Sequence, residues 1–168
     1  QVVCAKAKVS VSLPRDYKGT HMSRFVEVLT EWQHKNLLGV DIKGCLEKII
    51  NNLDAQSGEL EFKFPYFIDK KSPVKGMVAP MSYHCSFEGR IVDEEYKFIL
   101  GVEVPVTTLC PCSKEISENG AHNQRAFIKV QVSYDEKEQV WIDDLVELIE
   151  SCASCPVYPL LQSEHETL

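Results

Sequence analysis

Residues 104–125 read VPVTTLCPCSKEISENGAHNQR. Its apolar start is typical of a strand, whereas Pro111 has no N–H group with which to continue a hydrogen-bonded ladder. We therefore expect the strand to break between Cys110 and Cys112. A polar loop follows, and a second alternating strand begins near Arg125. The stretch predicts two strands joined by a loop, with cysteines at the end of the first strand.

Apolar and polar residues also alternate elsewhere in the chain, which predicts strands at 3–13, 59–68, 82–91, 97–106 and 124–134. Apolar residues at helical spacing predict one helix that Ser23 caps and a second helix over 42–53. Gly39 is expected to separate these two helices, and residues 93–95 to form a hairpin turn. A third helix is predicted over 141–153.

The third helix has an apolar side formed by Trp141, Leu145 and Leu148, which Ile142, Val146 and Ile149 widen. Strands and helices occur in separate blocks along the chain, without a regular β–α–β alternation. This order predicts an α+β fold with an antiparallel sheet. With 168 residues, of which 44% are hydrophobic, the chain can bury one sizeable core, so we expect one compact unit.

Charge and hydropathy exclude several classes of function. A net charge of −7 and a pI near 5.3 argue against general binding of nucleic acid or anionic membranes, because phosphate-rich partners require a basic surface. No apolar run approaches the ~20 residues that span a bilayer, and no charged-then-apolar leader precedes Val2. We expect a cytoplasmic protein.

Seven cysteines occur at irregular spacing, which is poor material for a disulfide framework, so we expect thiols. Cys152 and Cys155 have the spacing of a redox pair at the end of a helix. We favour the alternative, in which both are buried against the sheet.

Cys110 and His122 flank the loop between the two strands of the opening stretch. Such a hairpin can bring a thiolate and an imidazole within the ~2.0–2.3 Å bonds of one zinc-like ion. A structural site needs four protein ligands, which Cys112 and either Cys85 or Cys155 can complete. A catalytic site uses three ligands and leaves one position open for water.

Two long motifs, the opening stretch and GTHMSRF at residues 19–25, resemble the type IB GTP cyclohydrolases. The family starts folate synthesis in bacteria and methanopterin synthesis in archaea. The resemblance extends over the strand before Gly19 and over SCASCPVYPLL at residues 151–161, and thus over most of the chain.

The resemblance implies a tunnelling fold, in which an antiparallel sheet carries paired helices on one side and is duplicated within the subunit. We place two such modules at approximately 1–92 and 93–168 and expect the C-terminal part to be incomplete. The family forms homotetramers with active sites at subunit interfaces. Its enzymes hydrolyse GTP at guanine C8, release formate and form a 7,8-dihydroneopterin phosphate, either the triphosphate or a 2′,3′-cyclic phosphate.

The family's single metal ion, which is zinc, manganese or ferrous iron, is held by a Cys, a His and a Glu. The matching positions are Cys110 and His122, and counting from Leu161 favours Glu166 over Glu164, with His165 third. Cys110 and His122 are therefore also the expected catalytic residues. In the family a further segment carries an acidic residue that anchors the guanine, and no residue of this sequence matches it.

Four residues are candidates for binding the triphosphate. His21 and Arg24 lie beside the predicted helix start, where backbone N–H groups favour anions. Lys114 and Arg125 lie in and after the loop of the opening stretch. For each of the four, an exposed structural position is the competing interpretation. Cys112 is either a residue with a direct role, as a reserve metal ligand or a redox lock, or a residue that packs behind the ligands.

Two other classes of function remain open from the sequence. One is a non-catalytic module with a structural zinc site. The other is a thiol enzyme of the same superfold, such as the nitrile reductases that act on a deazaguanine and use a cysteine as nucleophile. These reductases lack the run from Cys-Pro-Cys to His-Asn-Gln-Arg, so we favour the cyclohydrolase.

Overall fold

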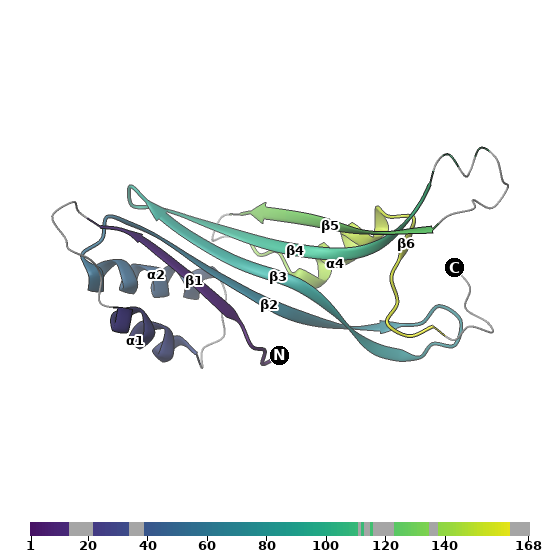
Figure 1. Ribbon diagram of the computed structural model, residues 1–168, viewed down its shortest axis with the longest axis horizontal. Helices are drawn as coiled ribbons and strands as arrows, with labels where there is room; N and C mark the ends of the chain where they lie inside the picture. The colour runs from purple at the N-terminus through teal and green to yellow at the C-terminus, as the bar shows by residue number, and fades with distance from the viewer. Residues whose placement is uncertain are drawn as a thin grey trace.

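The computed structural model describes residues 1–13, 22–33, 39–110, 112, 115, 123–134 and 138–161. Figure 1 shows the elements in chain order. They are β1 (Lys6–Ser12), α1 (Met22–Trp32), α2 (Gly39–Leu53), β2 (Ser57–Lys71), β3 (Val78–Val92), β4 (Glu95–Leu109), β5 (Asn123–Ser133), α4 (Ile142–Ser151) and β6 (Cys155–Pro156).

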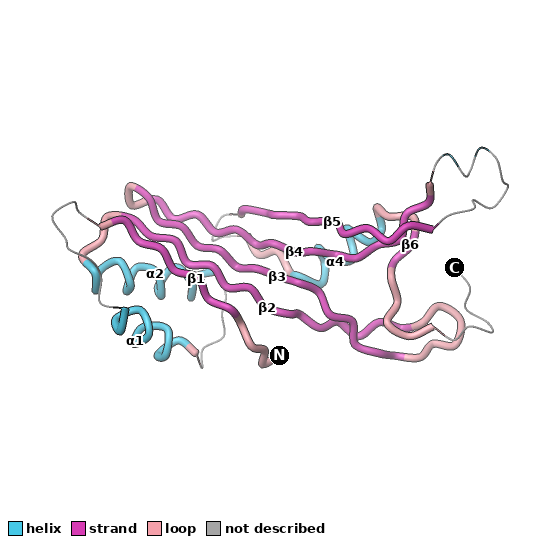
Figure 2. Tube along the Cα trace, viewed as in Figure 1, coloured by secondary structure: helices cyan, strands magenta, loops and turns pink. Residues whose placement is uncertain are grey.

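The strands form one sheet in the order β1-β2-β3-β4-β5, in which every pair is antiparallel, and β6 pairs with β4 (Figure 2). The predicted α+β class with an antiparallel sheet is confirmed. The strands predicted by alternation are all present, and several extend further than predicted. Among the described helices, none has the length and apolar character that crossing a bilayer requires.

The turn between β3 and β4 is the predicted hairpin. Asp93 and Glu94 have φ values of 50° and 65°, and the flanking residues Val92 and Glu95 are paired. Two consecutive residues with positive φ are typical of the tight turn whose twist matches that of the flanking strands. This turn fixes the register of the two central strands.

The sheet splits beyond its centre. β3 pairs with β4 only as far as His84 and Glu103, whereas β2 and β3 remain paired to Lys71 and Val78. β2 and β3 thus continue as a two-stranded ribbon, while β4 continues alongside β5 (Figure 1). β6 pairs with β4 at Val106 and Thr107, on the strand edge that β3 has left.

The described helices cover one face of the sheet and bury its apolar side chains. On that face Gly89 leaves room for Ile42 of α2, because an added Cβ would lie 2.7 Å from the Ile42 Cγ2 atom. α1 and α2 cover the end of the sheet that contains the β3–β4 turn, and α4 covers the opposite half (Figure 1). The core is formed by aliphatic and aromatic residues of β2, β3, β4 and these helices.

Three details of the helix predictions are wrong. Ser23 lies inside α1, which begins at Met22, and Gly39 is the first residue of α2 rather than a separator. α4 is shorter than predicted, and Trp141 and Leu148 on its apolar side are 54% and 61% exposed. The buried side of α4 is formed by Ile142, Leu145, Val146, Ile149 and Glu150. The sheet therefore buries only part of the apolar side of α4.

Candidate active site

Cys110 directly follows the last residue of β4 and is partly exposed. The preceding residue, Leu109, pairs with Asn123, which begins β5. The predicted strand break at Cys-Pro-Cys is confirmed, because β4 ends before Cys110 and Pro111. The register therefore brings the chain on either side of the loop to one end of the sheet.

Several predicted site residues lie outside the part of the chain that the structure describes. These are His21, Lys114, His122, Glu164, His165 and Glu166. Among the described residues, no three His, Cys, Asp or Glu side chains are arranged to hold a metal ion. The described residues therefore do not test whether the predicted metal ligands lie close together.

The remaining cysteines differ in their relation to Cys110. All seven lie in the described part of the chain, and none forms a disulfide, as expected. Cys155 pairs with Thr107, three residues before Cys110. Cys85 pairs with Val102, and eight residues of strand, roughly 26 Å, separate that position from Cys110. Cys85 therefore cannot complete a four-ligand site with Cys110, whereas Cys155 lies at the same end of the sheet.

The exposure of the cysteines contradicts one prediction. Cys152, which caps the C-terminal end of α4, is exposed, and Cys155 is partly exposed. The expectation that both are buried against the sheet is therefore wrong for Cys152. Cys112 is also exposed, and its role stays a prediction.

Cys85 is buried on the helix-covered face of β3. Burial raises the pKa of its thiol to about 12, and the nearby Asp143 carboxylate adds to the shift. Burial disfavours the charged thiolate, which is the reactive form. Cys85 is consequently poor material for a nucleophile or a metal ligand.

We predict that Cys85 resists alkylation in the folded protein while the exposed Cys4 reacts. At pH 8 only about one Cys85 thiol in 10⁴ is ionised when its pKa is about 12. The measurement is brief iodoacetamide treatment followed by peptide mass spectrometry. In urea both residues should be alkylated. Equal alkylation of Cys85 and Cys4 without denaturant would contradict the prediction.

The two described candidates for phosphate binding have intrachain contacts. Arg24 donates a hydrogen bond of 2.8 Å from Nη1 to the carbonyl oxygen of Asn52, near the C-terminal end of α2. A cation is favourable there because the last carbonyl groups of a helix carry partial negative charge. Arg125 is exposed on β5, and its guanidinium carbon lies 5.6 Å from the centre of the Phe127 ring.

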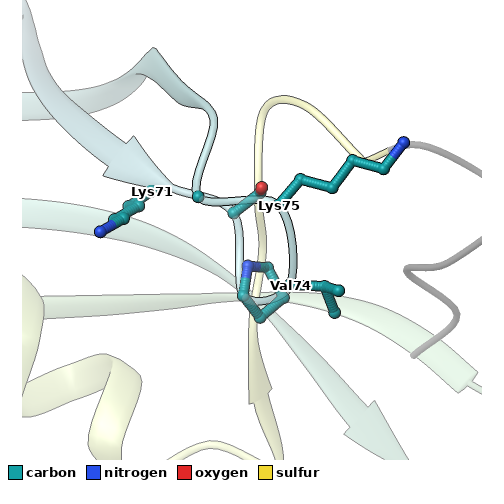
Figure 3. Close-up of a pocket in the computed structure, with 6 residues that line it drawn as sticks. Lys71, Val74 and Lys75 are labelled. Carbon is teal, nitrogen blue, oxygen red and sulfur yellow. The ribbon is translucent and has the colours of Figure 1, made fainter.

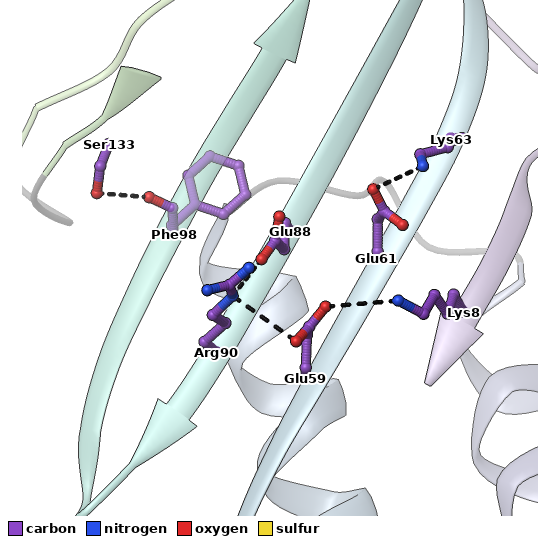
Figure 4. Close-up of polar contacts among 8 residues, drawn as sticks. All are labelled: Lys8, Glu59, Glu61, Lys63, Glu88, Arg90, Phe98 and Ser133. Atoms are coloured by element: carbon purple, nitrogen blue, oxygen red, sulfur yellow. Dashed lines mark hydrogen bonds and ion pairs between the residues drawn. The ribbon is translucent and has the colours of Figure 1, made fainter. Parts of the chain in front are cut away.

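Charged side chains lie on the helix-free face of the sheet where β1, β2 and β3 pair. Figure 4 shows Arg90 beside both Glu88 and Glu59, with Lys8 on the neighbouring strand 4.0 Å from Glu59. On β4 and β5, Lys129 lies 2.9 Å from Glu103. The hydrogen bond from Lys129 lowers the pKa of the Glu103 carboxyl group. Opposite charges on neighbouring strands stabilise the pairing only modestly when exposed.

Sequence reasoning missed a buried polar cluster between α4 and the ribbon. Tyr83 is fully buried and donates a hydrogen bond of 2.9 Å to Glu150 Oε1, and Lys70 forms an ion pair with Glu150 Oε2. Burial and the Glu150 contact raise the pKa of Tyr83. Lys70 and Glu150 are 80 positions apart, so no local pattern indicates the pair.

The hairpin at the tip of the ribbon encloses an open hollow of about 640 Å³, lined by residues 71–76. Lys71 and Lys75 are its cationic residues, and Figure 3 shows their side chains pointing in opposite directions. Because the amines do not converge, the hollow lacks the arrangement that holds one anion. Of the predicted site residues that the structure describes, none lines it.

The chain has an α+β fold, in which an antiparallel sheet carries helices on one face. A thiol lies beyond the end of a central strand. These features define its structural class. A family model described as "Type I GTP cyclohydrolase folE2" matches residues 1–168. Because the match covers the whole chain, the protein belongs to this family.

Relatives of known name support the assignment. The protein named GTP cyclohydrolase FolE2 from Geotalea uraniireducens is 47% identical over 166 residues, which is 99% of this chain and 60% of the relative. Those from Geobacter sulfurreducens and Maridesulfovibrio salexigens are 48% and 47% identical, with 63% and 64% of their lengths covered. The chain thus spans a little over three fifths of the relatives that it matches.

Proposed function

We propose that this protein is a GTP cyclohydrolase of type IB. It would hydrolyse GTP at guanine C8, release formate and form a 7,8-dihydroneopterin phosphate, the first step of folate or methanopterin biosynthesis. The observation that carries the proposal is the match over residues 1–168, which includes the strand-end cysteine and its loop. The names of the relatives support the same reaction.

We propose that Cys110, His122 and Glu166 hold one divalent metal ion, which is zinc, manganese or ferrous iron. The donor set fits such an ion, because a thiolate and a carboxylate balance its two charges and the imidazole adds a third donor. Chain geometry supports Cys110 and His122 as partners. Each is one residue from the Leu109–Asn123 pair, and consecutive Cα atoms are ~3.8 Å apart.

Residues of the chain have different roles in the proposed reaction. A bound ion would lower the pKa of water toward neutrality and so supply the attacking group for the electron-poor ring carbon. His122 acts first as a ligand, since an imidazole bound to a metal is a poor base, and a neighbouring group moves protons during hydrolysis of the formamide. Cys110, at the end of the paired strand β4, fixes the position of the site relative to the sheet.

Substrate binding is proposed to involve two copies of the chain. Arg24 lies at the α2 end of the sheet, whereas Cys110 follows the opposite end of β4, and the 15-residue strand between these ends is roughly 45 Å long. That length far exceeds one nucleotide. If His21 and Arg24 bind the triphosphate of a GTP held at Cys110, they must come from a partner subunit. This supports a homotetramer with active sites at interfaces, in which Lys114 and Arg125 would belong to the Cys110 side.

Replacing His21 or Arg24 by alanine should weaken GTP binding by about 10-fold and guanosine binding much less, because a charged hydrogen bond to phosphate is lost. Isothermal titration of both ligands provides the comparison. Guanosine is the control for Arg24→Ala, since loss of the bond to Asn52 affects both ligands alike. Equal weakening for the two ligands would assign these residues a structural role.

The finer features of the fold belong to the same proposal. We propose a tunnelling fold with modules at approximately 1–92 and 93–168, and the Asp93–Glu94 turn lies at their boundary. A sheet whose described helices all lie on one face supports this architecture. A cytoplasmic location is proposed because seven thiols suit a reducing compartment.

Incubation of the full-length, metal-reconstituted protein with GTP under anaerobic conditions tests the proposed function. Mass spectrometry should identify a dihydroneopterin phosphate and show whether it is the triphosphate or the cyclic form. Stoichiometric metal binding without any consumption of GTP would refute the cyclohydrolase and favour a structural metal module.

A further inference from the structure

α4 bridges the split in the sheet. Its buried apolar side packs on β4, and its polar side chains reach the ribbon formed by β2 and β3. At its start, Asp143 accepts a hydrogen bond of 2.8 Å from Tyr66. At its end, Glu150 contacts both Tyr83 and Lys70. The two ends are thus attached to the ribbon by different kinds of contact.

The contact at the end of α4 is buried and charged. The side chains of Glu150 and Lys70 are 7% and 18% exposed, and Tyr83 is 0% exposed. Both carboxylate oxygens of Glu150 have a partner, one in Tyr83 and the other in Lys70. Asp143, by comparison, is exposed.

A buried carboxylate restricts the position of the helix that carries it. Apolar contacts such as those of Val146 and Ile149 are non-directional and tolerate small shifts. A shift that separates Glu150 from Lys70 leaves a buried charge without its partner, which is strongly unfavourable. The Lys70–Glu150–Tyr83 cluster therefore selects one position for the last turn of α4.

That last turn leads directly to the strand beside Cys110. Cys155 follows Glu150 by five residues and pairs with Thr107 of β4, and Cys110 lies three residues, roughly 10 Å, beyond Thr107. Because β6 is antiparallel to β4, the chain leaves β6 at Pro156 on the side away from Cys110. A displaced end of α4 would displace β6 first.

We infer that Glu150, held by Lys70 and Tyr83, is a positioning residue that fixes β6 against β4, next to the strand end that leads to Cys110. Its effect on the metal site rests on the proposed function, whereas its effect on β6 does not. The cluster acts through the backbone of β6 and need not contact substrate or metal. Sequence resemblance to the family assigns no role to these three residues.

Glu150→Gln in the full-length protein tests the inference, because it removes the charge and keeps the shape. Hydrogen–deuterium exchange should become at least ~10-fold faster for the amides of residues 152–155, which lead into and include β6, since Pro156 itself has no N–H group. Exchange in α1 and α2 should not change. Zinc affinity, measured by competition with a chromophoric chelator, should fall by about 10-fold, as for the loss of a supporting contact. Lys70→Met should act in the same direction, and Lys70→Arg should preserve both properties.

Tyr66→Phe is the matched control, since it removes the exposed contact at the other end of α4 and should leave β6 exchange unchanged. Unchanged β6 exchange in Glu150→Gln would overturn the inference without affecting the proposed function. A uniform rise in exchange across the sheet with unaltered zinc affinity would also overturn it and show a purely structural role. A wild-type protein without zinc affinity would refute the proposed function, and β6 exchange alone would then decide the inference.

Discussion

Replacing Cys110 by alanine is expected to abolish metal retention and to lower formate release from GTP by at least ~1000-fold. The thiolate is one of only three proposed protein ligands, and the remaining imidazole and carboxylate leave the ion with too few donors. Metal content is measured by plasma mass spectrometry after desalting, and formate by an enzymatic assay.

The structure provides controls for this substitution. Cys4 is an exposed thiol near the start of the chain, so Cys4→Ala should retain both metal and activity. Cys112→Ala tests the neighbouring exposed thiol, and loss of metal in that variant would identify Cys112 as a ligand. Full activity of Cys110→Ala with bound metal would remove Cys110 from the site.

Glu166→Ala should lower metal affinity at least ~10-fold, whereas Glu164→Ala should retain the metal. Cys110 and His122 alone leave a divalent ion with a net positive charge, and a carboxylate neutralises it. The segment can reach the site, because β6 pairs with β4 near Cys110 and the ten residues from Pro156 to Glu166 can span up to ~36 Å.

Chelator competition with zinc measures both variants. Glu166→Gln is the matched control for size, and it should lose affinity as Glu166→Ala does, because the charge is absent. If Glu164→Ala loses the metal and Glu166→Ala does not, the ligand has been assigned two residues too late. If neither variant loses it, the carboxylate comes from elsewhere.

The sheet could be predicted from the sequence because its signals are local. Alternation in β3 and β4 and the acidic turn at Asp93 and Glu94 each lie within a few residues, and the structure contains all of them. The helix starts were less predictable. Ser23 is a favourable cap by residue type, yet α1 begins one residue earlier, and tertiary packing rather than propensity sets such boundaries.

The candidate site was predictable only in part, for a physical reason. Cys110 and Cys112 form a motif because they are neighbours in sequence, and resemblance to a family predicts a role for Cys110. Lys70 and Glu150 become neighbours only when the ribbon and α4 meet, 80 positions apart. On its own, Glu150 resembles any charged residue of an amphipathic helix, and its burial is visible only in the fold.

X-ray absorption at the zinc edge of the zinc-loaded, full-length protein tests the central claim most directly. The proposed site predicts one sulfur ligand at ~2.3 Å and nitrogen or oxygen ligands at ~2.0–2.2 Å, with the same sulfur ligand present in Cys112→Ala. Three or four sulfur ligands would instead indicate a structural zinc site. A zinc ion without any sulfur ligand would contradict the assignment of Cys110.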